Sequence, residues 1–374
     1  MSTVFVVNSG SSSIKYQVVD LETSEAVISG LIERIGEPGS SVADHTAGML
    51  IVLEKLGDLG ESIIAVGHRV VHGGSEFAGP ALITDDVVRS IEALSQLAPL
   101  HNPANLLGIH AARVALPHVP HVAVFDTAFH QTMPASAYTY AIPTDIAEEY
   151  KVRRYGFHGT SHKFVSEEAA AVLGKPVADV RTIVLHLGNG ASVTAVDGGK
   201  SVDTSMGLTP LQGLVMGTRS GDIDPAVLTH LSRAAGMSID DLDVLLNRKS
   251  GLLGLTGMGD MRDVQAAAGS GDARAELALQ VWAHRIRHYI GAYFAQLGGL
   301  DALVFTAGVG ENNALLRRRA TAGLEHMGIL IDDDRNELKS KRPRVISPDG
   351  APVTVMVIPT NEELEIARQV ASIV

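Results

Sequence analysis

Apolar segments and short polar turns alternate in two similar stretches of the chain. Residues 4–31 contain three apolar segments, and the first turn between them is the run of asparagine, glycine and serines at 8–13. Residues 182–205 repeat this arrangement around the Gly-Asn-Gly turn at 188–190. Each stretch predicts three strands joined by tight turns. Because the pattern recurs about half a chain later, we predict an α/β fold built from a duplicated domain.

Apolar periodicity and capping residues predict the other elements. Further strands are expected at 63–66, 121–125, 303–306 and 353–358, and helices at 42–55, 84–97, 102–115, 160–173 and 273–297. We expect a loop at 254–259 and N-caps at Asn102 before Pro103, at Ser238 with Asp241 and at Thr360 with Glu363. In the longest helix, the apolar positions three and four apart are assigned to the core, namely Leu277, Val281, Trp282, Ile286, Ile290, Tyr293, Phe294 and Leu297.

Composition limits the class of protein. A chain of 374 residues, 45% of them hydrophobic, can form two cores. We place the first domain at 1–150, rejoined by a terminal helix at 361–374, and the second at 151–360. The net charge of −12 argues against a general nucleic-acid or membrane-surface partner. The absence of cysteine excludes disulfides and thiol catalysis. No signal peptide or membrane span is recognisable, so we expect a cytoplasmic location.

The two glycine-rich turns are suited to phosphate. A turn with little side-chain bulk directs backbone N–H groups to a common point, where they can hold phosphate oxygens. Two such turns facing each other would hold a nucleoside triphosphate in a cleft between the domains. This arrangement differs from a Walker A loop, because Lys15 is followed by strand residues rather than by a helix.

Charged side chains follow several of the predicted strands. Arg69 ends one strand and Asp126 follows another, the place where open α/β sheets bind ligands. A structural ion pair for Arg69 and a turn cap for Asp126 are the alternatives. His158 precedes a predicted helix start, where an anion is favoured. Arg219 is the only basic residue of the glycine-rich loop 206–224, which suits an arginine that contacts phosphate.

Two further segments have more than one interpretation. The strand at 303–306 leads into Gly308-Val309-Gly310, which is similar to a dinucleotide fingerprint, but Asn313 occupies the third glycine position. A purine or ribose contact is therefore favoured there over a dinucleotide site. Glu362, in the first turn of the terminal helix, either complements the helix dipole or binds a metal.

Taken together, these motifs resemble the acetate kinase family, within the superfamily of acetokinases, actin, Hsp70 and sugar kinases. The resemblance implies duplicated actin-like, ribonuclease H-like domains with a nucleotide cleft between them. It covers nearly the whole chain, and no motif position departs from the family pattern. The matching segments are NSGSSSIKY, GHRVVHGG, PLHNP, FDTAFHQTMP, RRYGFHGTSH, HLGNGAS, DTSMGLTPLQGLVMGTRSGDIDP, FTAGVGENN and TNEE.

The resemblance implies reversible, Mg²⁺-dependent phosphoryl transfer from ATP to acetate, giving acetyl phosphate and ADP, with Mn²⁺ as an alternative metal. The implied catalytic residues are Asp126, His158 and Arg219. The implied acetate contacts are Arg69, Val71, Leu100, Phe157 and Pro210. The implied nucleotide contacts are Lys15, His186, Leu187, Gly188, Asn189, Gly190, Asp260, Met261, Arg262, Gly308, Val309, Gly310, Glu311 and Asn312. Asn8 and Glu362 would help to bind the metal, and a homodimer is implied.

The chemistry of the residue types agrees with this reading. Transfer of a phosphoryl group to a carboxylate brings several negative charges together, so cationic side chains lower the barrier. A carboxylic acid with a pKa of about 4 to 5 is already ionised at neutral pH and needs no general base. We therefore expect Asp126 to position an arginine or a metal-bound water rather than to take a proton from acetate.

Two alternatives remain open at this stage. The first is the same reaction with propionate or butyrate, because one methylene changes pocket binding by only about 1–3 kcal/mol. The second is an actin-like or Hsp70-like binding protein that uses ATP as a switch. The chain offers no separate peptide-binding domain, and two arginines suit an anionic second substrate better.

Overall fold

The computed structural model describes residues 2–99 and 101–374, which form two compact units. The first unit comprises the described residues of three segments, Met1–Gln131, Phe157–Phe164 and Asn361–Val374. The second comprises Thr132–Gly156 and Val165–Thr360. This division differs from the predicted boundary at 150, because 132–156 groups with the second unit and 157–164 with the first. Leu100, predicted to contact acetate, lies outside the described residues.

The first unit contains a six-stranded sheet with the strand order β3-β2-β1-β4-β6-β5. Its strands are β1 (Thr3–Gly10), β2 (Ser13–Asp20), β3 (Glu25–Glu33), β4 (Ile63–Val70), β5 (Ala81–Leu82) and β6 (His121–Phe125). β1, β2 and β3 pair antiparallel, with Asn8 opposite Lys15. β4 is parallel to β1 and to β6, and β5 closes the edge antiparallel to β6.

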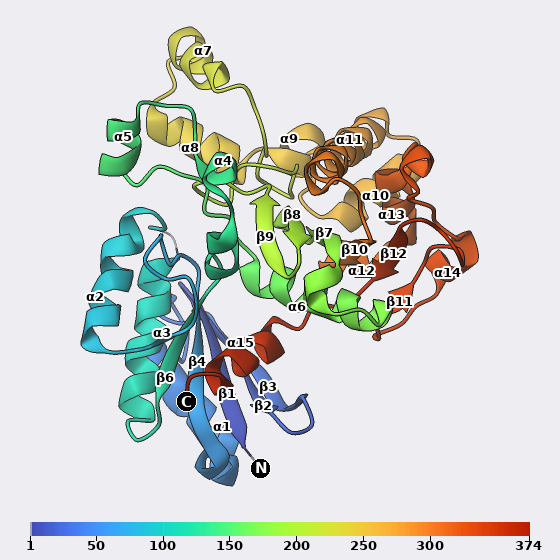
Figure 1. Cartoon of the computed structure of the whole chain (residues 1–374). Helices are drawn as coiled ribbons and strands as arrows, with labels where there is room; N and C mark the ends of the chain where they lie inside the picture. The colour runs from blue at the N-terminus through green and yellow to red at the C-terminus, as the bar shows by residue number, and fades with distance from the viewer. Residues whose placement is uncertain (1, 100) are drawn as a thin grey trace. The chain divides into compact units, whose positions relative to one another are not determined.

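The second unit contains a sheet with the order β11-β12-β10-β7-β8-β9. Its strands are β7 (Arg181–Leu187), β8 (Ala191–Asp197), β9 (Lys200–Thr204), β10 (Ala302–Thr306), β11 (Arg344–Val345) and β12 (Thr354–Val357). Read from β9, the pairings are an antiparallel meander, two parallel neighbours and an antiparallel edge strand. The first sheet has the same sequence of pairings, so the predicted duplication is confirmed (Figure 1).

Helices cover each sheet. The helices of the first unit are α1 (His45–Leu56), α2 (Asp85–Ala93), α3 (Asn102–Ala115), the beginning of α6 (Gly159–Leu173) and α15 (Glu362–Ala371), with 3-10 turns η1 (Gly57–Ser62), η2 (Leu94–Gln96) and η3 (Ala128–Thr132) at or near its segments. Those of the second are α4 (Ala135–Tyr138), α5 (Thr144–Glu149), the rest of α6, α7 (Ala226–Ala235), α8 (Ile239–Arg248), α9 (Gly251–Thr256), α10 (Met261–Gly269), α11 (Ala273–Leu297), α12 (Ala307–Asn312), α13 (Ala314–Thr321) and α14 (Asp333–Glu337), with η4 (Val177–Asp179) and η5 (Glu325–Met327). Within the described chain, none of these helices has the length and apolar character required to cross a membrane.

The last helix, α15, completes the core of the first unit. It packs against β1 and β4, where Gly67 leaves room for it. A Cβ atom at Gly67 would lie 2.8 Å from Val370 Cγ2 and 2.9 Å from Ile366 Cγ2. Close helix packing therefore depends on a residue without a side chain at this position of β4.

The structure corrects several predicted caps and loops. Asn102 does not cap α3, because its side chain accepts a hydrogen bond from His72 N at 3.1 Å and donates to His72 O at 3.0 Å. The N-cap of α15 is Asn361, which accepts from Leu364 N, not Thr360. The capping box of Ser238 with Asp241 is confirmed. The predicted loop at 254–259 begins with the end of α9, and the glycine-rich turn after β10 is helix α12.

The predicted core of α11 is correct on one face only. Trp282, Ile286 and Ile290 are buried, whereas Leu277 is 56% and Val281 37% exposed. The helix is apolar around more of its circumference than the sheet and neighbouring helices cover. Periodicity thus located the helix but overstated its buried face.

Candidate functional site

A bidentate ion pair joins the ends of two parallel strands in the first unit. Arg69 lies in β4 opposite Val124 of β6, and Asp126 follows β6 directly, so both side chains reach the same edge of the sheet. Arg69 Nε donates to Asp126 Oδ1 at 3.0 Å and Nη2 donates to Oδ2 at 2.5 Å. Asp126 is 1% exposed. The structure therefore contains the ion pair that was the alternative interpretation of Arg69, with Asp126 as its partner.

The two partners of this pair respond differently to burial. Burial raises the pKa of Asp126 from 3.8 to about 6, although the Arg69 guanidinium acts to lower it. Burial also acts to lower the pKa of Arg69, but Asp126 and Glu362 outweigh it, and the pKa of the guanidinium is raised. Arg69 therefore stays charged, while Asp126 takes up a proton in mildly acidic solution.

Two oxygen-bearing side chains lie beside Arg69. Asn8 Oδ1 accepts a hydrogen bond from Arg69 Nη1 at 3.2 Å, and Glu362 Oε2 lies 4.0 Å from Arg69 Nε. Thr160 Oγ1 donates to the same Glu362 oxygen at 3.3 Å. We call Asn8, Arg69, Asp126 and Glu362 the acid–arginine cluster. It unites the two predicted metal ligands with the predicted acetate-binding arginine.

The cluster supplies oxygen donors of the kind that Mg²⁺ prefers. Among residues 2–99 and 101–374, no group of three or more His, Asp or Glu side chains is arranged to hold a metal ion. Mg²⁺ does not need such a group, because it is commonly held by one or two carboxylates, water and substrate phosphates. The Glu362 carboxylate and the Asn8 amide oxygen therefore fit a phosphate-bound Mg²⁺.

His158 occupies an unusual backbone position at the start of α6. Its φ is +57°, a left-handed conformation that side-chain-bearing residues adopt at a cost. Gly159 N then donates to Asp126 O at 2.8 Å, which holds the helix start against the ion-paired residue. Next to it, Phe157 is buried and its ring packs edge-on against His72 at 5.5 Å. Val71, the other described apolar candidate of this unit, is 8% exposed.

Arg219 is a half-buried cation in the loop between β9 and α7 of the second unit. Its Nη1 donates to the carbonyl oxygen of Pro210 at 2.6 Å. No carboxylate lies within ion-pair distance of Arg219 in the described part of the chain, and burial lowers its pKa. A buried charge without a counter-charge is costly, so Arg219 is suited to an anionic ligand.

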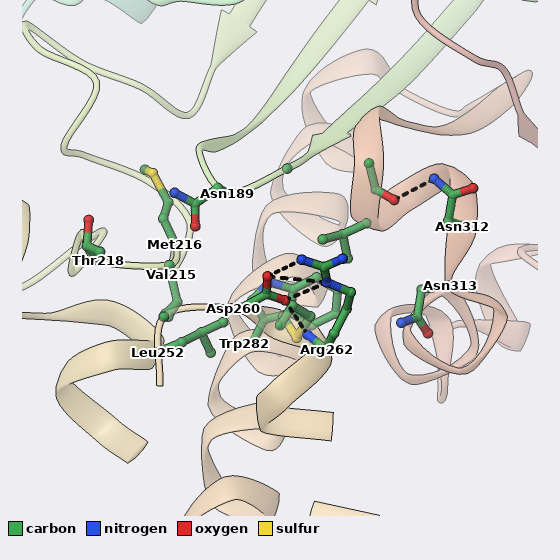
Figure 2. Close-up of a pocket in the computed structure, with 16 residues that line it drawn as sticks. Asn189, Val215, Met216, Thr218, Leu252, Asp260, Arg262, Trp282, Asn312 and Asn313 are labelled. Atoms are coloured by element: carbon green, nitrogen blue, oxygen red, sulfur yellow. Dashed lines mark hydrogen bonds and ion pairs between the residues drawn. The ribbon is translucent and has the colours of Figure 1, made fainter. Parts of the chain in front are cut away.

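A cavity of about 830 Å³ lies in the second unit. Its lining residues are Gly188, Asn189, Val215, Met216, Gly217, Thr218, Leu252, Gly259, Asp260, Met261, Arg262, Trp282, Gly308, Val309, Asn312 and Asn313. Figure 2 shows Asp260 and Arg262 between Met216 and Leu252 on one side and Asn312 and Asn313 on the other. A mainly apolar cavity with a few polar side chains is typical of a site for a flat, heteroatom-bearing ligand such as a purine.

Segments distant in sequence build this cavity. The β7–β8 turn contributes Asn189, and its backbone oxygen accepts a hydrogen bond from Gly217 N at 3.0 Å. Gly217 has no room for a side chain, because a Cβ atom there would lie 2.8 Å from Gly259 O. Directly after Gly259, Arg262 Nη2 contacts Asp260 Oδ2 at 2.5 Å, and the Arg262 hydrogen bonds lower the pKa of Asp260 to about 2.

The cavity brings together some of the predicted nucleotide contacts and not others. Those that line it are Gly188, Asn189, Asp260, Met261, Arg262, Gly308, Val309 and Asn312. Those that do not are His186, Leu187, Gly190, Gly310, Glu311 and Lys15, and Lys15 belongs to the first unit. Lys15 Nζ lies 2.5 Å from Glu363 Oε1. The Lys15 side chain is 59% exposed, and its ammonium has three N–H donors, so this ion pair leaves donors for phosphate.

Sequence reasoning missed several lining residues. Trp282 was assigned to the core, and it is indeed only 3% exposed, but it also faces the cavity. Val215 to Thr218 lie in the glycine-rich loop 206–224, for which the sequence predicts only Pro210 and Arg219 as site residues. The density of glycines in that loop was the available signal, because it permits close approach of the backbone to a ligand.

Comparison with known proteins gives a consistent result. A sequence model described as the Acetokinase family matches residues 3–368. The chain is 64% identical over 389 aligned residues to the acetate kinase of Clavibacter michiganensis subsp. michiganensis, covering 99% of this chain and 98% of that protein. The crystal structure of Porphyromonas gingivalis acetate kinase superposes with a TM-score of 0.96 at 43% identity, covering both chains completely. A propionate kinase from Francisella tularensis subsp. tularensis SCHU S4 gives a TM-score of 0.92, also at 43% identity and with 99% of each chain covered. The chain belongs to the acetokinase family.

Proposed function

We propose that the protein is an acetate kinase, which transfers the γ-phosphoryl group of ATP to acetate and runs the reaction in reverse from acetyl phosphate and ADP. Family membership over residues 3–368 is the observation that carries this proposal. The cavity of the second unit and the acid–arginine cluster of the first supply the two kinds of binding group that the reaction needs.

The cavity is proposed to hold the adenosine of ATP. Its apolar wall, including Met216, Leu252 and Trp282, suits the faces of a purine ring. Asn189 and Asn312 offer amide groups that can donate and accept hydrogen bonds. The phosphates then extend from the cavity near the β7–β8 turn.

Arg69 is proposed to bind the acetate carboxylate. A guanidinium has five N–H donors, and in the described contacts Asp126 uses two of them and Asn8 one. The remaining two donors belong to Nη1 and Nη2 and can bind a carboxylate. In this arrangement Asp126 fixes the plane of the guanidinium and does not act as a base.

The transfer is proposed to be direct. An ionised acetate oxygen attacks the γ-phosphorus, the bond from phosphorus to the bridging oxygen breaks, and that oxygen leaves with the electron pair on ADP. No proton has to move, because acetate is already ionised at neutral pH. Arg219 and His158 donate hydrogen bonds to the phosphoryl oxygens as charge builds up on them.

Asn8 and Glu362 are the residues that would hold Mg²⁺. When bound, the ion neutralises phosphate charge and orients the phosphates. Thr160 and Arg69 keep Glu362 in place, because both contact its Oε2 atom. We also include assembly as a homodimer and a cytoplasmic location in the proposal.

The test is trapping of acyl phosphate by hydroxylamine. Purified protein with ATP, Mg²⁺ and acetate is expected to yield acetohydroxamate and ADP in equal amounts. The matched control variant is Arg69→Gln, which should lose most of the acetate-dependent signal and keep nucleotide binding. ADP formation that does not depend on acetate, without hydroxamate, would contradict the proposal and favour a nucleotide-switched binding protein.

Propionate is the second candidate substrate, because a propionate kinase is as similar in sequence as an acetate kinase among the compared structures. One additional methylene changes binding by about 1–3 kcal/mol. We expect kcat/KM to fall in the order acetate, propionate, butyrate. An equal or higher kcat/KM for propionate would reassign the acid.

A further inference from the structure

A single tyrosine hydroxyl bridges both sides of the turn that carries Pro210. Tyr140 Oη donates to Gln212 Oε1 at 2.6 Å and accepts from Leu208 N at 3.2 Å. Leu208 and Gln212 stand two residues before and two residues after Pro210. The hydroxyl therefore closes the segment 208–212 into a compact turn with Pro210 at its apex.

The apex of this turn orients Arg219. Pro210 O accepts the 2.6 Å hydrogen bond from Arg219 Nη1. In the described part of the chain this is the one hydrogen bond recorded for the Arg219 guanidinium, and no acid pairs with it. The direction of the guanidinium thus depends on the position of the Pro210 carbonyl.

Few other contacts hold the middle of the segment. Its flanks are anchored, because Gly207 O accepts from Tyr155 N at 3.0 Å and Gly213 N donates to Asp222 Oδ1 at 3.0 Å. Pro210 itself has no N–H group to donate. Between these anchors, Gly207 N donates to Thr209 O at 3.3 Å, and Leu211 N donates to Thr209 Oγ1 at 3.4 Å across Pro210. The Tyr140 hydroxyl adds the contacts that join Leu208 to Gln212.

The contact is built into the local packing. A Cβ atom at Gly207 would collide with both Tyr140 Oη and Gln212 Oε1, so the hydroxyl fits closely only because a glycine stands there. Burial raises the pKa of Tyr140, which keeps the proton that the hydroxyl donates. The guanidinium of Arg154 lies 5.9 Å from the centre of the Tyr140 ring.

We propose that Tyr140 is a positioning residue for phosphoryl transfer, which acts through the 208–212 turn by fixing Pro210 and, through its carbonyl, the Arg219 guanidinium. This inference rests on the proposed role of Arg219. The hydroxyl of Tyr140 bonds to Gln212 and Leu208, so on this proposal its removal affects the reaction by releasing the two residues that it holds.

The test removes one oxygen atom. Tyr140→Phe is expected to lower kcat by about 10- to 100-fold, since small misplacements of a catalytic group cost up to about 10²-fold in rate. The KM for ATP should change little, because the cavity wall is held separately by backbone bonds such as Leu252 N to Met216 O at 2.9 Å. The ratio of kcat/KM for acetate to kcat/KM for propionate should decrease, because Pro210 becomes mobile. Tyr150→Phe is the control, because that side chain is 62% exposed and kcat should stay at the wild-type value.

A double-mutant cycle with Arg219→Ala separates positioning from general stability. If Tyr140 acts through Arg219, adding Tyr140→Phe to Arg219→Ala should lower kcat by less than about twofold further. An equal fold-loss in both backgrounds, or a wild-type kcat in Tyr140→Phe, overturns the inference and leaves the proposed function standing. A wild-type kcat in Arg219→Ala overturns the proposed role of Arg219 itself. Should Tyr140→Phe fail to fold by circular dichroism, Gln212→Met removes one arm of the same bridge and takes its place in the cycle.

Discussion

Replacement of Asp126 by asparagine should change the stability of the protein and its catalytic activity in opposite directions. The substitution keeps the shape of the side chain and removes its charge. Because burial raises the pKa from 3.8 to about 6, ionised Asp126 costs the folded state about 3 kcal/mol at pH 7. Asparagine avoids this cost but replaces one acceptor by an N–H₂ group facing Arg69, a loss of about 1–2 kcal/mol. We expect Asp126→Asn to be about 1–2 kcal/mol more stable than the wild type at pH 7.

The same variant should be a poor enzyme. Without the bidentate carboxylate, the Arg69 guanidinium can rotate, and we expect kcat/KM for acetate to fall about 10²-fold. The wild type should show a similar loss as pH falls through about 6, where Asp126 takes up its proton. Ionisation of acetate itself lies lower, at a pKa of about 4 to 5. The acid limb of the wild-type profile should therefore be absent from the Asp126→Asn profile.

Urea unfolding at about pH 7 measures the change in stability. Hydroxamate kinetics from about pH 5 to about pH 8, a range that brackets the raised pKa of Asp126, measure the change in kcat/KM. Asp20→Asn is the matched control, because Asp20 is 4% exposed and accepts one hydrogen bond from Glu22 N at 2.8 Å. A loss of about 3–5 kcal/mol in Asp126→Asn, as for an ion pair that supports the fold, would refute the stability argument. Unchanged kcat/KM with an unchanged acid limb would refute the positioning role.

Three further predictions concern the first unit. His68 Nε2 and His121 Nδ1 lie 3.0 Å apart, and burial lowers the pKa of both imidazoles. Because the unfolded chain then binds more protons than the folded one below a pH of about 6.5, the free energy of unfolding should decrease as the pH falls from there. A pH dependence of stability that His68→Asn leaves unchanged would contradict this. Gly67→Val should destabilise the protein by about 1–3 kcal/mol through collision with α15, measured by urea unfolding, with Gly79→Val, which meets nothing within 4 Å, as control. Gly159→Ala should lower kcat, because its Cβ would collide with the Asp126 carbonyl and displace the ion-paired residue. The loss in transition-state free energy should exceed the loss in the free energy of unfolding. Equal losses, or no loss in either, would contradict this.

The sheets were largely predictable because their signals are local. Alternating apolar residues and glycine turns define β1 to β3 and β7 to β9 without reference to the rest of the chain. The cap at Asn102 failed for the opposite reason. Its side-chain amide is hydrogen-bonded to the backbone of His72, thirty positions earlier. A capping rule based on neighbouring residues cannot predict a tertiary partner that competes for the same amide.

The candidate site shows the same contrast. Arg69 and Asp126 were singled out because each ends a parallel strand, and the topology then brings them together. The direct contact of Lys15 with Glu363 was not foreseeable, because it joins β2 to α15 across most of the chain. Trp282 shows a further limit, since helical periodicity marks a buried side chain equally well against a core and against a cavity wall.

The place of α15 in the first sheet has a consequence for synthesis on the ribosome. Domains generally fold as they emerge, starting from the N-terminus, but β1 and β4 receive their covering helix only after the whole second unit has been made. The nascent first unit must therefore wait with an apolar sheet face uncovered. Chaperones that shield such surfaces should engage this nascent chain until Val370, which packs close to Gly67, has left the exit tunnel.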